Sequence, residues 1–92
     1  MSKITIALAD SQYLIRVGLK HLIEELEQFE VTSEAANEKS LLENLERTKP
    51  HVVIFDYHQP DSFSIDTIEK IKAVSPTSNI LVISGDGEKE NV

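Results

Sequence analysis

Four short apolar segments alternate with three longer amphipathic segments along this chain of 92 residues. The apolar segments span residues 3–8, 29–35, 51–55 and 80–83. The last two are near-continuous apolar runs rich in β-branched residues, which is typical of strands covered on both faces. Strands that alternate with helices are nearly always parallel and joined by right-handed crossovers. The sequence therefore predicts an α/β fold with a doubly wound parallel sheet, in the order β-α-β-α-β-α-β.

The three amphipathic segments predict helices over residues 12–28, 38–48 and 65–74. Each follows a candidate N-cap, and a proline stops the second and follows the third. Apolar residues recur every three or four positions, so one face of each helix should pack inward. The caps are Ser11, Asn37 and Ser64, the prolines are Pro50 and Pro76, and the inward side chains are Ile15, Leu19, Leu22, Ile23, Leu26, Leu41, Leu42, Leu45, Ile65, Ile68, Ile71 and Val74.

The segment 29–35 differs from the other predicted strands because it alternates in polarity. Phe29, Val31, Ser33 and Ala35 occupy every second position, which predicts an edge strand with one solvated face. After Ser84, residues 85–87 (Gly-Asp-Gly) predict a turn, and a short polar tail follows at residues 88–92. We expect this segment to be the first part of a larger domain, which would leave the last strand as an open apolar edge.

Composition narrows the classes of function. Nine basic and sixteen acidic residues give a net charge of −7, which opposes binding to nucleic acid phosphates or anionic membranes. The absence of cysteine excludes disulfides and thiolate metal sites. No apolar run approaches the ~20 residues that span a membrane. We expect a cytoplasmic domain, with eight acids between Glu24 and Glu46 forming a solvated face.

Three polar side chains should meet at the carboxyl ends of the strands, where open α/β sheets bind ligands. Asp10, Asp56 and Ser84 follow the first, third and fourth predicted strands. Two neighbouring carboxylates favour a hard cation such as Mg²⁺, and a carboxylate beside that cation can attack phosphorus. Taken alone, Asp10 or Asp56 could be a turn residue or a helix cap, and Ser84 could be a loop hydroxyl. Their joint placement indicates formation of an aspartyl phosphate at Asp56.

These segments resemble the receiver domains of response regulators. Residues 52–60 resemble the phosphoacceptor strand, an apolar run followed by D-x-x-x-P, and residues 6–11 resemble the first strand with its acidic end. Residues 16–19, 31–35 and 80–84 are similar to receivers of the NarL/FixJ subfamily. The resemblance implies a flavodoxin/CheY-like fold, here incomplete with four strands, and covers about three quarters of a typical receiver.

The resemblance also implies roles for individual residues. Asp56 would accept a phosphoryl group from a histidine kinase. Asp10, Asp56 and the backbone carbonyl of His58 would hold Mg²⁺, Ser84 would be the switch hydroxyl, and Gly85 would leave room for the phosphoryl group. The family implies a C-terminal DNA-binding domain in the longer protein. We also expect a homodimer, since the last strand and part of the first helix would lack packing neighbours.

Two departures from the family pattern affect this expectation. Receivers usually carry a pair of acids after the first strand, and here the first of them is Ala9. The family lysine at the end of a fifth strand has no counterpart, because the sequence stops before that strand. We therefore expect the segment itself to be phosphorylated poorly.

Two other functions fit parts of the sequence. A pseudo-receiver, which mediates protein interaction without phosphorylation, is favoured by Ala9. A small mononucleotide- or flavin-binding domain would need a first loop rich in glycine, serine or threonine, and Asp10 occupies that loop instead. An independent enzyme is not expected, because no histidine or second base is placed at the strand ends.

Overall fold

The computed structural model describes residues 3–56 and 65–83. Within these ranges the elements are, in chain order, β1 (Ile4–Ala9), α1 (Tyr13–Glu24), β2 (Phe29–Ala35), α2 (Glu38–Thr48), β3 (Val52–Asp56), α3 (Ile65–Val74) and β4 (Asn79–Ile83). The predicted alternation of strands and helices is confirmed for the described residues. The bounds of β2, α2 and α3 match the prediction, while β1 and β3 lie one residue later.

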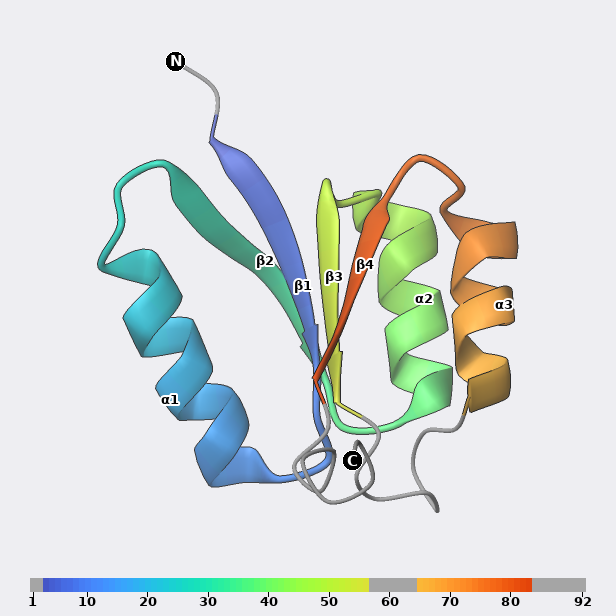
Figure 1. The fold of residues 1–92 in the computed structure, drawn as a ribbon, viewed down its shortest axis with the longest axis horizontal. Coiled ribbons are helices and arrows are strands. Elements are labelled where there is room, and N and C mark those ends of the chain that lie inside the picture. Colours follow the sequence, from blue (N-terminus) through green and yellow to red (C-terminus); the bar gives the residue numbers. More distant parts are fainter. Residues whose placement is uncertain (1–2, 57–64, 84–92) are drawn as a thin grey trace, which may run out of the picture.

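The described strands form one parallel sheet in the order β2-β1-β3-β4. The chain passes from β1 outward to β2, and then crosses back over β1 to β3 and β4. Figure 1 shows α1 on one face of this sheet, and α2 beside α3 on the other. The prediction of a doubly wound α/β fold is therefore confirmed, and the winding reverses between β1 and β3.

The main core lies between the sheet and the face of α2 and α3. Leucines of α2 and an isoleucine of α3 cover small residues of β1 and β2 and larger residues of β3. The buried members of this cluster are Ala7, Ala9, Ala35, Leu41, Leu45, Val53, Phe55 and Ile71. Because such side chains are almost fully removed from water, this layer supplies most of the hydrophobic stabilisation of the described part.

Helix α2 begins and ends where local sequence chemistry predicts. The Asn37 side chain accepts a hydrogen bond of 2.9 Å from the Ser40 backbone N–H, which confirms Asn37 as the N-cap. At the other end Lys49 adopts a left-handed conformation with φ of 46°, and buried Pro50 follows. The predicted cap of α3, Ser64, lies outside the described residues.

Strand β2 contains an irregularity that the alternating pattern did not predict. Ile6 pairs with Val31, but Ala7 pairs with Ser33, so one residue of β2 is inserted at this point. Because successive strand residues face opposite sides, Phe29 and Val31 lie on the α1 side, whereas Ser33 and Ala35 lie on the α2 side. The prediction of one shared face is therefore wrong, although β2 is an edge strand of the described sheet as predicted.

Helix α1 is shorter and more exposed than predicted. It ends at Glu24, because residues 25–28 form turns that lead into β2. Ser11 is not its N-cap; Gln12 occupies that position, with no hydrogen bond from its own side chain. Three residues of the predicted inward stripe are exposed, namely Ile15, Leu22 and Leu26. The reason is that α1 packs mainly on β2 and the adjoining part of β1, so its outer side has no neighbour among the described elements.

The predicted open apolar edge is confirmed at β4, an edge strand of the described sheet, but the prediction that both faces of this strand are covered is wrong. The near-continuous apolar run was expected to be covered on both faces, but Leu81, Val82 and Ile83 are all exposed. The cause is topological, since β4 lies at the edge of the described sheet beside β3. The interior strand β3 follows the prediction on one face, where Val53 and Phe55 are fully buried, whereas Val52 and Ile54 on the other face are half-buried.

Candidate functional site

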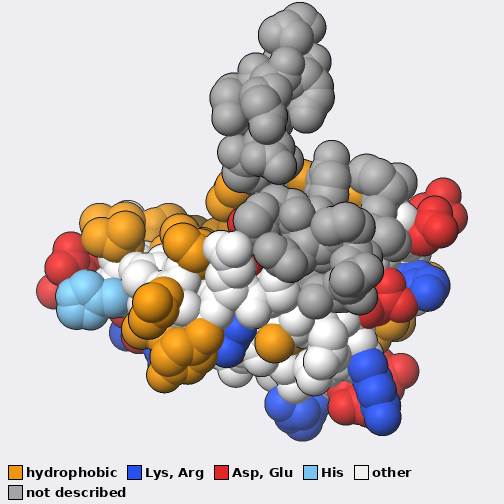
Figure 2. All heavy atoms as spheres, turned by 90° about the horizontal axis from the view of Figure 1, so that it is seen from below, with side chains coloured by type: hydrophobic (Ala, Val, Ile, Leu, Met, Phe, Trp, Pro, Cys, Tyr) orange, Lys and Arg blue, Asp and Glu red, His pale blue; other side chains and the backbone are white. Residues whose placement is uncertain are grey.

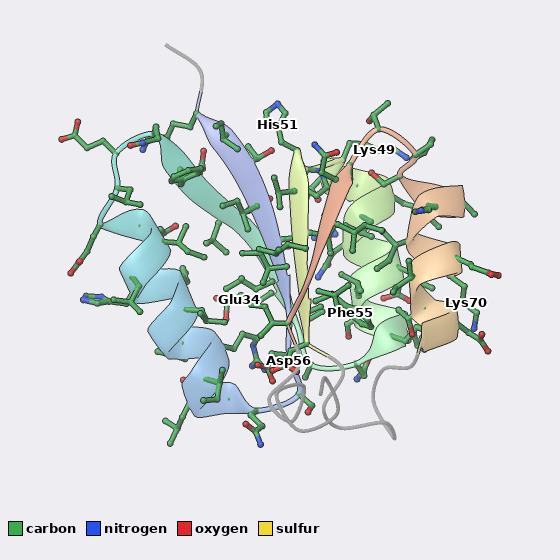
Figure 3. The ribbon with its side chains drawn as sticks, viewed as in Figure 1. Glu34, Lys49, His51, Phe55, Asp56 and Lys70 are labelled. Atoms are coloured by element: carbon green, nitrogen blue, oxygen red, sulfur yellow. The ribbon has the colours of Figure 1, made fainter. Side chains whose placement is uncertain are left out.

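Two predicted acids lie at the carboxyl ends of neighbouring strands. Asp56 is the last residue of β3 and is half-buried, and Asp10 directly follows β1 with 2% of its surface exposed. Leu8 pairs with Ile54 and Ala9 with Phe55, so the same register brings Asp10 beside Asp56. Both acids lie two residues beyond a paired position, which places them on the same side of the sheet. Figure 3 shows Asp56 at the edge where the strands end.

Asp10 is held through three of its own groups. Its backbone N–H donates to the Ala35 carbonyl at 3.1 Å, and its Oδ1 accepts from the Gln12 backbone N–H at 2.8 Å. Its backbone carbonyl accepts from Nη1 of Arg16 at 2.8 Å. Asp10 therefore closes the turn between β1 and α1, and the position of its carboxylate is set by the same contacts.

Arg16 connects this turn to strand β2. Its Nε lies 3.3 Å from Oε1 of Glu34, and Nζ of Lys20 lies 3.5 Å from Oε2 of the same carboxylate. The guanidinium also lies over the ring of Tyr13, 5.5 Å from its centre. Figure 3 shows the Glu34 side chain between the sheet and α1. Glu34 was predicted to belong to a solvated acidic face, and this was wrong because the insertion in β2 turns it toward α1.

The contact of Arg16 with the backbone of Asp10 is one that the sequence did not predict. Arg16 lies in the first turn of α1, a helix whose sequence predicted only an inward-facing apolar stripe. The sequence does place Arg16 four positions before Lys20, on one face of a helix, and Glu34 on the following strand. Their contact could not be predicted from this spacing, because it depends on the inserted residue in β2, which turns Glu34 toward α1.

Ala9 occupies the position at which receiver domains usually carry the first of two acids. It is buried and belongs to the core cluster on the α2 side of the sheet. Among the described residues there is no group of three histidine, aspartate or glutamate side chains that could hold a metal. Asp10 and Asp56 nevertheless fit Mg²⁺, because this cation commonly binds one or two carboxylates and keeps several waters.

The other predicted site residues lie outside the described residues. These are His58, Ser84 and Gly85. The structure therefore brings together Asp10 and Asp56 and leaves the predictions for the remaining three as predictions. None of the helices in the described ranges is long and apolar enough to cross a membrane.

Comparison with known proteins agrees with this geometry. Residues 6–92 match the response regulator receiver domain family. The chain is 32% identical over 87 residues to the uncharacterized transcriptional regulatory protein YhcZ of Bacillus subtilis (strain 168), covering 95% of this chain and 41% of that protein. It is 30% identical over 88 residues to the nitrate/nitrite response regulator protein NarL of Escherichia coli (strain K12), covering 96% and 41%.

A solved structure of a response regulator has a similar fold. A two-component response regulator of the LuxR family from Aurantimonas sp. SI85-9A1 superimposes with a TM-score of 0.81 and 26% identity, covering 90% of this chain and 59% of that chain. This chain spans about two fifths of the length of the two regulators named above. From its sequence match and its fold, the chain belongs to the response regulator receiver domain family, and among its relatives are NarL-type regulators.

Proposed function

We propose that this domain accepts a phosphoryl group on Asp56 from the phosphohistidine of a histidine kinase. A carboxylate oxygen of Asp56 attacks phosphorus, a P–O bond forms, the P–N bond breaks, and the histidine leaves with its electron pair. The observation that carries the proposal is the register of β1 and β3, which brings Asp10 beside Asp56. A second carboxylate there serves to bind the cation that the reaction needs.

Receiver domains generally bind Mg²⁺ at the acidic phosphorylation site. We propose that Asp10, Asp56 and the backbone carbonyl of His58 hold it in this chain. When bound, Mg²⁺ neutralises negative charge on the phosphoryl oxygens and on the carboxylates. Asp10 orients the cation, Ser84 donates a hydrogen bond to a phosphoryl oxygen, and Gly85 leaves space for it.

The proposed partners follow from the regulators that the chain resembles. We propose that the domain belongs to a longer cytoplasmic protein, in which phosphorylation controls a C-terminal DNA-binding domain. The receiver would catalyse its own phosphorylation and would not be an enzyme in any further sense. The segment itself, with a net charge of −7, would not bind nucleic acid.

Self-association is also proposed. Figure 2 shows hydrophobic side chains gathered on one side of the molecule, over α1, and the exposed apolar residues of that helix include Tyr13, Leu14 and Val17. Apolar side chains of β4 are exposed as well. Sedimentation at increasing concentration tests the proposal, and a monomer at every concentration would contradict it.

A pseudo-receiver is the second candidate, and the packing of Ala9 favours it. Where the family usually has an acid, Ala9 is part of the hydrophobic core, so one cation ligand is missing. A protein of this kind would act by binding partners without being phosphorylated. Titration with Mg²⁺ separates the two candidates, because binding that disappears in Asp10→Ala supports the phosphoacceptor and absence of binding supports the pseudo-receiver.

Intact-mass spectrometry with a small phosphodonor tests the phosphoacceptor directly. We expect slow addition of one phosphoryl group that requires Mg²⁺ and is lost in Asp56→Asn. Asp66→Asn is the matched control, because Asp66 is an exposed acid in the first turn of α3 and its loss should change nothing. Equal modification of the wild type and Asp56→Asn would exclude Asp56 as the acceptor.

A further inference from the structure

We infer that Arg16 is a positioning residue for the cation site, and that Glu34 offsets its charge so that it can serve there. This inference rests on the proposed function, because it concerns the same site. Arg16 would hold Asp10 in the orientation that binds Mg²⁺, and Glu34 would keep the charge of Arg16 from opposing the cation.

Arg16 acts on the backbone of Asp10. Its Nη1 donates to the carbonyl of Asp10 at 2.8 Å, while the Gln12 N–H holds the Asp10 carboxylate itself. The backbone carbonyl and the carboxylate of Asp10 are therefore each held by a hydrogen bond, and loss of the Arg16 bond would leave the Asp10–Ser11 peptide freer to rotate. In metal sites, removal of a group that holds a ligand in place typically costs about 10- to 100-fold in metal affinity or activity.

Arg16 is itself immobilised. Only 13% of its side chain is exposed, and its Nε donates to Glu34 on β2. The face of the Tyr13 ring lies against the guanidinium. A planar guanidinium can donate to two acceptors in fixed directions at once, which an ammonium cannot do as well. Arg16 thus joins the turn after β1 to the neighbouring strand.

A positive side chain close to a cation site repels the cation unless its charge is offset. The carboxylate of Glu34 lies within ion-pair distance of both Arg16 and Lys20. Lys20 is substantially exposed, so solvent screens it more than the nearly buried guanidinium. Glu34 therefore allows Arg16 to hold the Asp10 carbonyl with little cost to Mg²⁺ binding.

The test compares Mg²⁺ affinity in four variants by titration calorimetry. Arg16→Gln should raise the Kd for Mg²⁺ by about tenfold or more, the usual effect of losing a group that holds a ligand. Arg16→Lys should recover part of the affinity. Glu34→Gln should raise the Kd about three- to tenfold, because it leaves the guanidinium charge without its counter-charge. The control Lys20→Gln removes another cation from Glu34 without touching Asp10, and should change the Kd less than about twofold.

A second readout needs no Mg²⁺. Hydrogen exchange of the Gln12 amide reports the bond to Asp10 Oδ1. We expect exchange to be at least about tenfold faster in Arg16→Gln and unchanged in Lys20→Gln. Thermal unfolding shows whether each variant is folded. If Arg16→Gln does not fold, Arg16→Lys is compared with the wild type in its place.

The outcomes separate the two proposals. If the wild type binds Mg²⁺ but Arg16→Gln binds it equally well, the positioning role is wrong and the proposed function stands. If affinity falls as much in Lys20→Gln as in Arg16→Gln, general charge on α1 is responsible and the positioning role is again wrong. If the wild type does not bind Mg²⁺, the proposed function and this inference both fail.

Discussion

The carboxylate of Glu38, in the first turn of α2, lies 2.8 Å from the ammonium nitrogen of Lys70 in α3. Its other oxygen accepts a hydrogen bond of 2.6 Å from the buried hydroxyl of Thr67. The bond from Lys70 first, and then that from Thr67, hold the pKa of Glu38 below its ordinary value of 4.5. The same bond to Glu38 raises the pKa of Lys70 above 10.5. This contact joins the two helices on the core side of the sheet.

The contact predicts how stability depends on pH. Since the folded-state pKa of Glu38 is lowered, its contribution is present above pH 4.5 and is lost as pH falls through the folded pKa. Since the pKa of Lys70 is raised, its contribution is present below pH 10.5 and is lost as pH rises past the folded value. Glu38→Gln should therefore be less stable than the wild type at pH 7, and the difference should shrink in acid.

Urea unfolding from pH 3 to pH 7 measures that difference. Glu43→Gln is the control, because Glu43 is an exposed acid of the same helix, and it should follow the wild type at every pH. A difference between Glu38→Gln and the wild type that persists undiminished at pH 3 would contradict the role of the Glu38 charge.

His51 should stabilise the opposite end of the sheet. Its ring Nδ1 accepts a hydrogen bond of 2.9 Å from the Thr5 backbone N–H, and the His51 backbone N–H donates to the Thr5 backbone carbonyl at 3.0 Å. Figure 3 shows His51 at the edge of the sheet away from Asp56. His51→Ala should lower the free energy of unfolding by about 0.5–1.5 kcal/mol and speed exchange of the Thr5 amide.

His21→Ala provides the comparison for His51. His21 lies on α1 and is strongly exposed, with its Nε2 3.6 Å from Glu25. Its removal should change the free energy of unfolding by less than about 0.5 kcal/mol. Similar losses in both variants would show that the bond to Thr5 does not contribute.

Leu45 and Leu22 should differ sharply although both are leucines on helices. Leu45 is fully buried against the sheet, whereas 62% of Leu22 is exposed. Leu45→Ala should cost about 2–5 kcal/mol, because it removes apolar contacts and leaves a cavity. Leu22→Ala should cost less than about 0.5 kcal/mol in a monomer. Denaturant unfolding at low protein concentration measures both, and equal costs would mean that α1 packs more tightly than the structure shows.

Restoring an acid at position 9 should exchange stability for cation affinity. Ala9→Asp would place a carboxylate in the core cluster, which should lower the free energy of unfolding by about 1–3 kcal/mol without Mg²⁺. With Mg²⁺ in excess, a tenfold gain in affinity would return about 1.4 kcal/mol. Ala9→Asn has the same size without the charge and should show no such recovery. Thermal unfolding with and without Mg²⁺ decides, and identical behaviour of the two variants would refute the prediction.

Local sequence patterns were enough to predict the elements and to place the ends of the described strands within one residue. Hydrophobic periodicity distinguishes a strand from a helix, and Asn37 begins α2 because its side chain bonds to a backbone group three residues away. Asp56 was predicted at the carboxyl end of this strand because the apolar run stops there. All of these features depend on residues that are close together in the sequence.

Tertiary structure decided which side chains meet. The extra residue in β2 turns Glu34 toward α1, and only then can Arg16 join it while holding Asp10. Apolar periodicity marks a face but does not say whether anything covers it, so Leu22 and Leu81 are exposed despite matching their patterns. The physical reason is that strand register and helix placement minimise the free energy of the whole fold, and a contact between distant residues leaves no periodic trace in the sequence around either one.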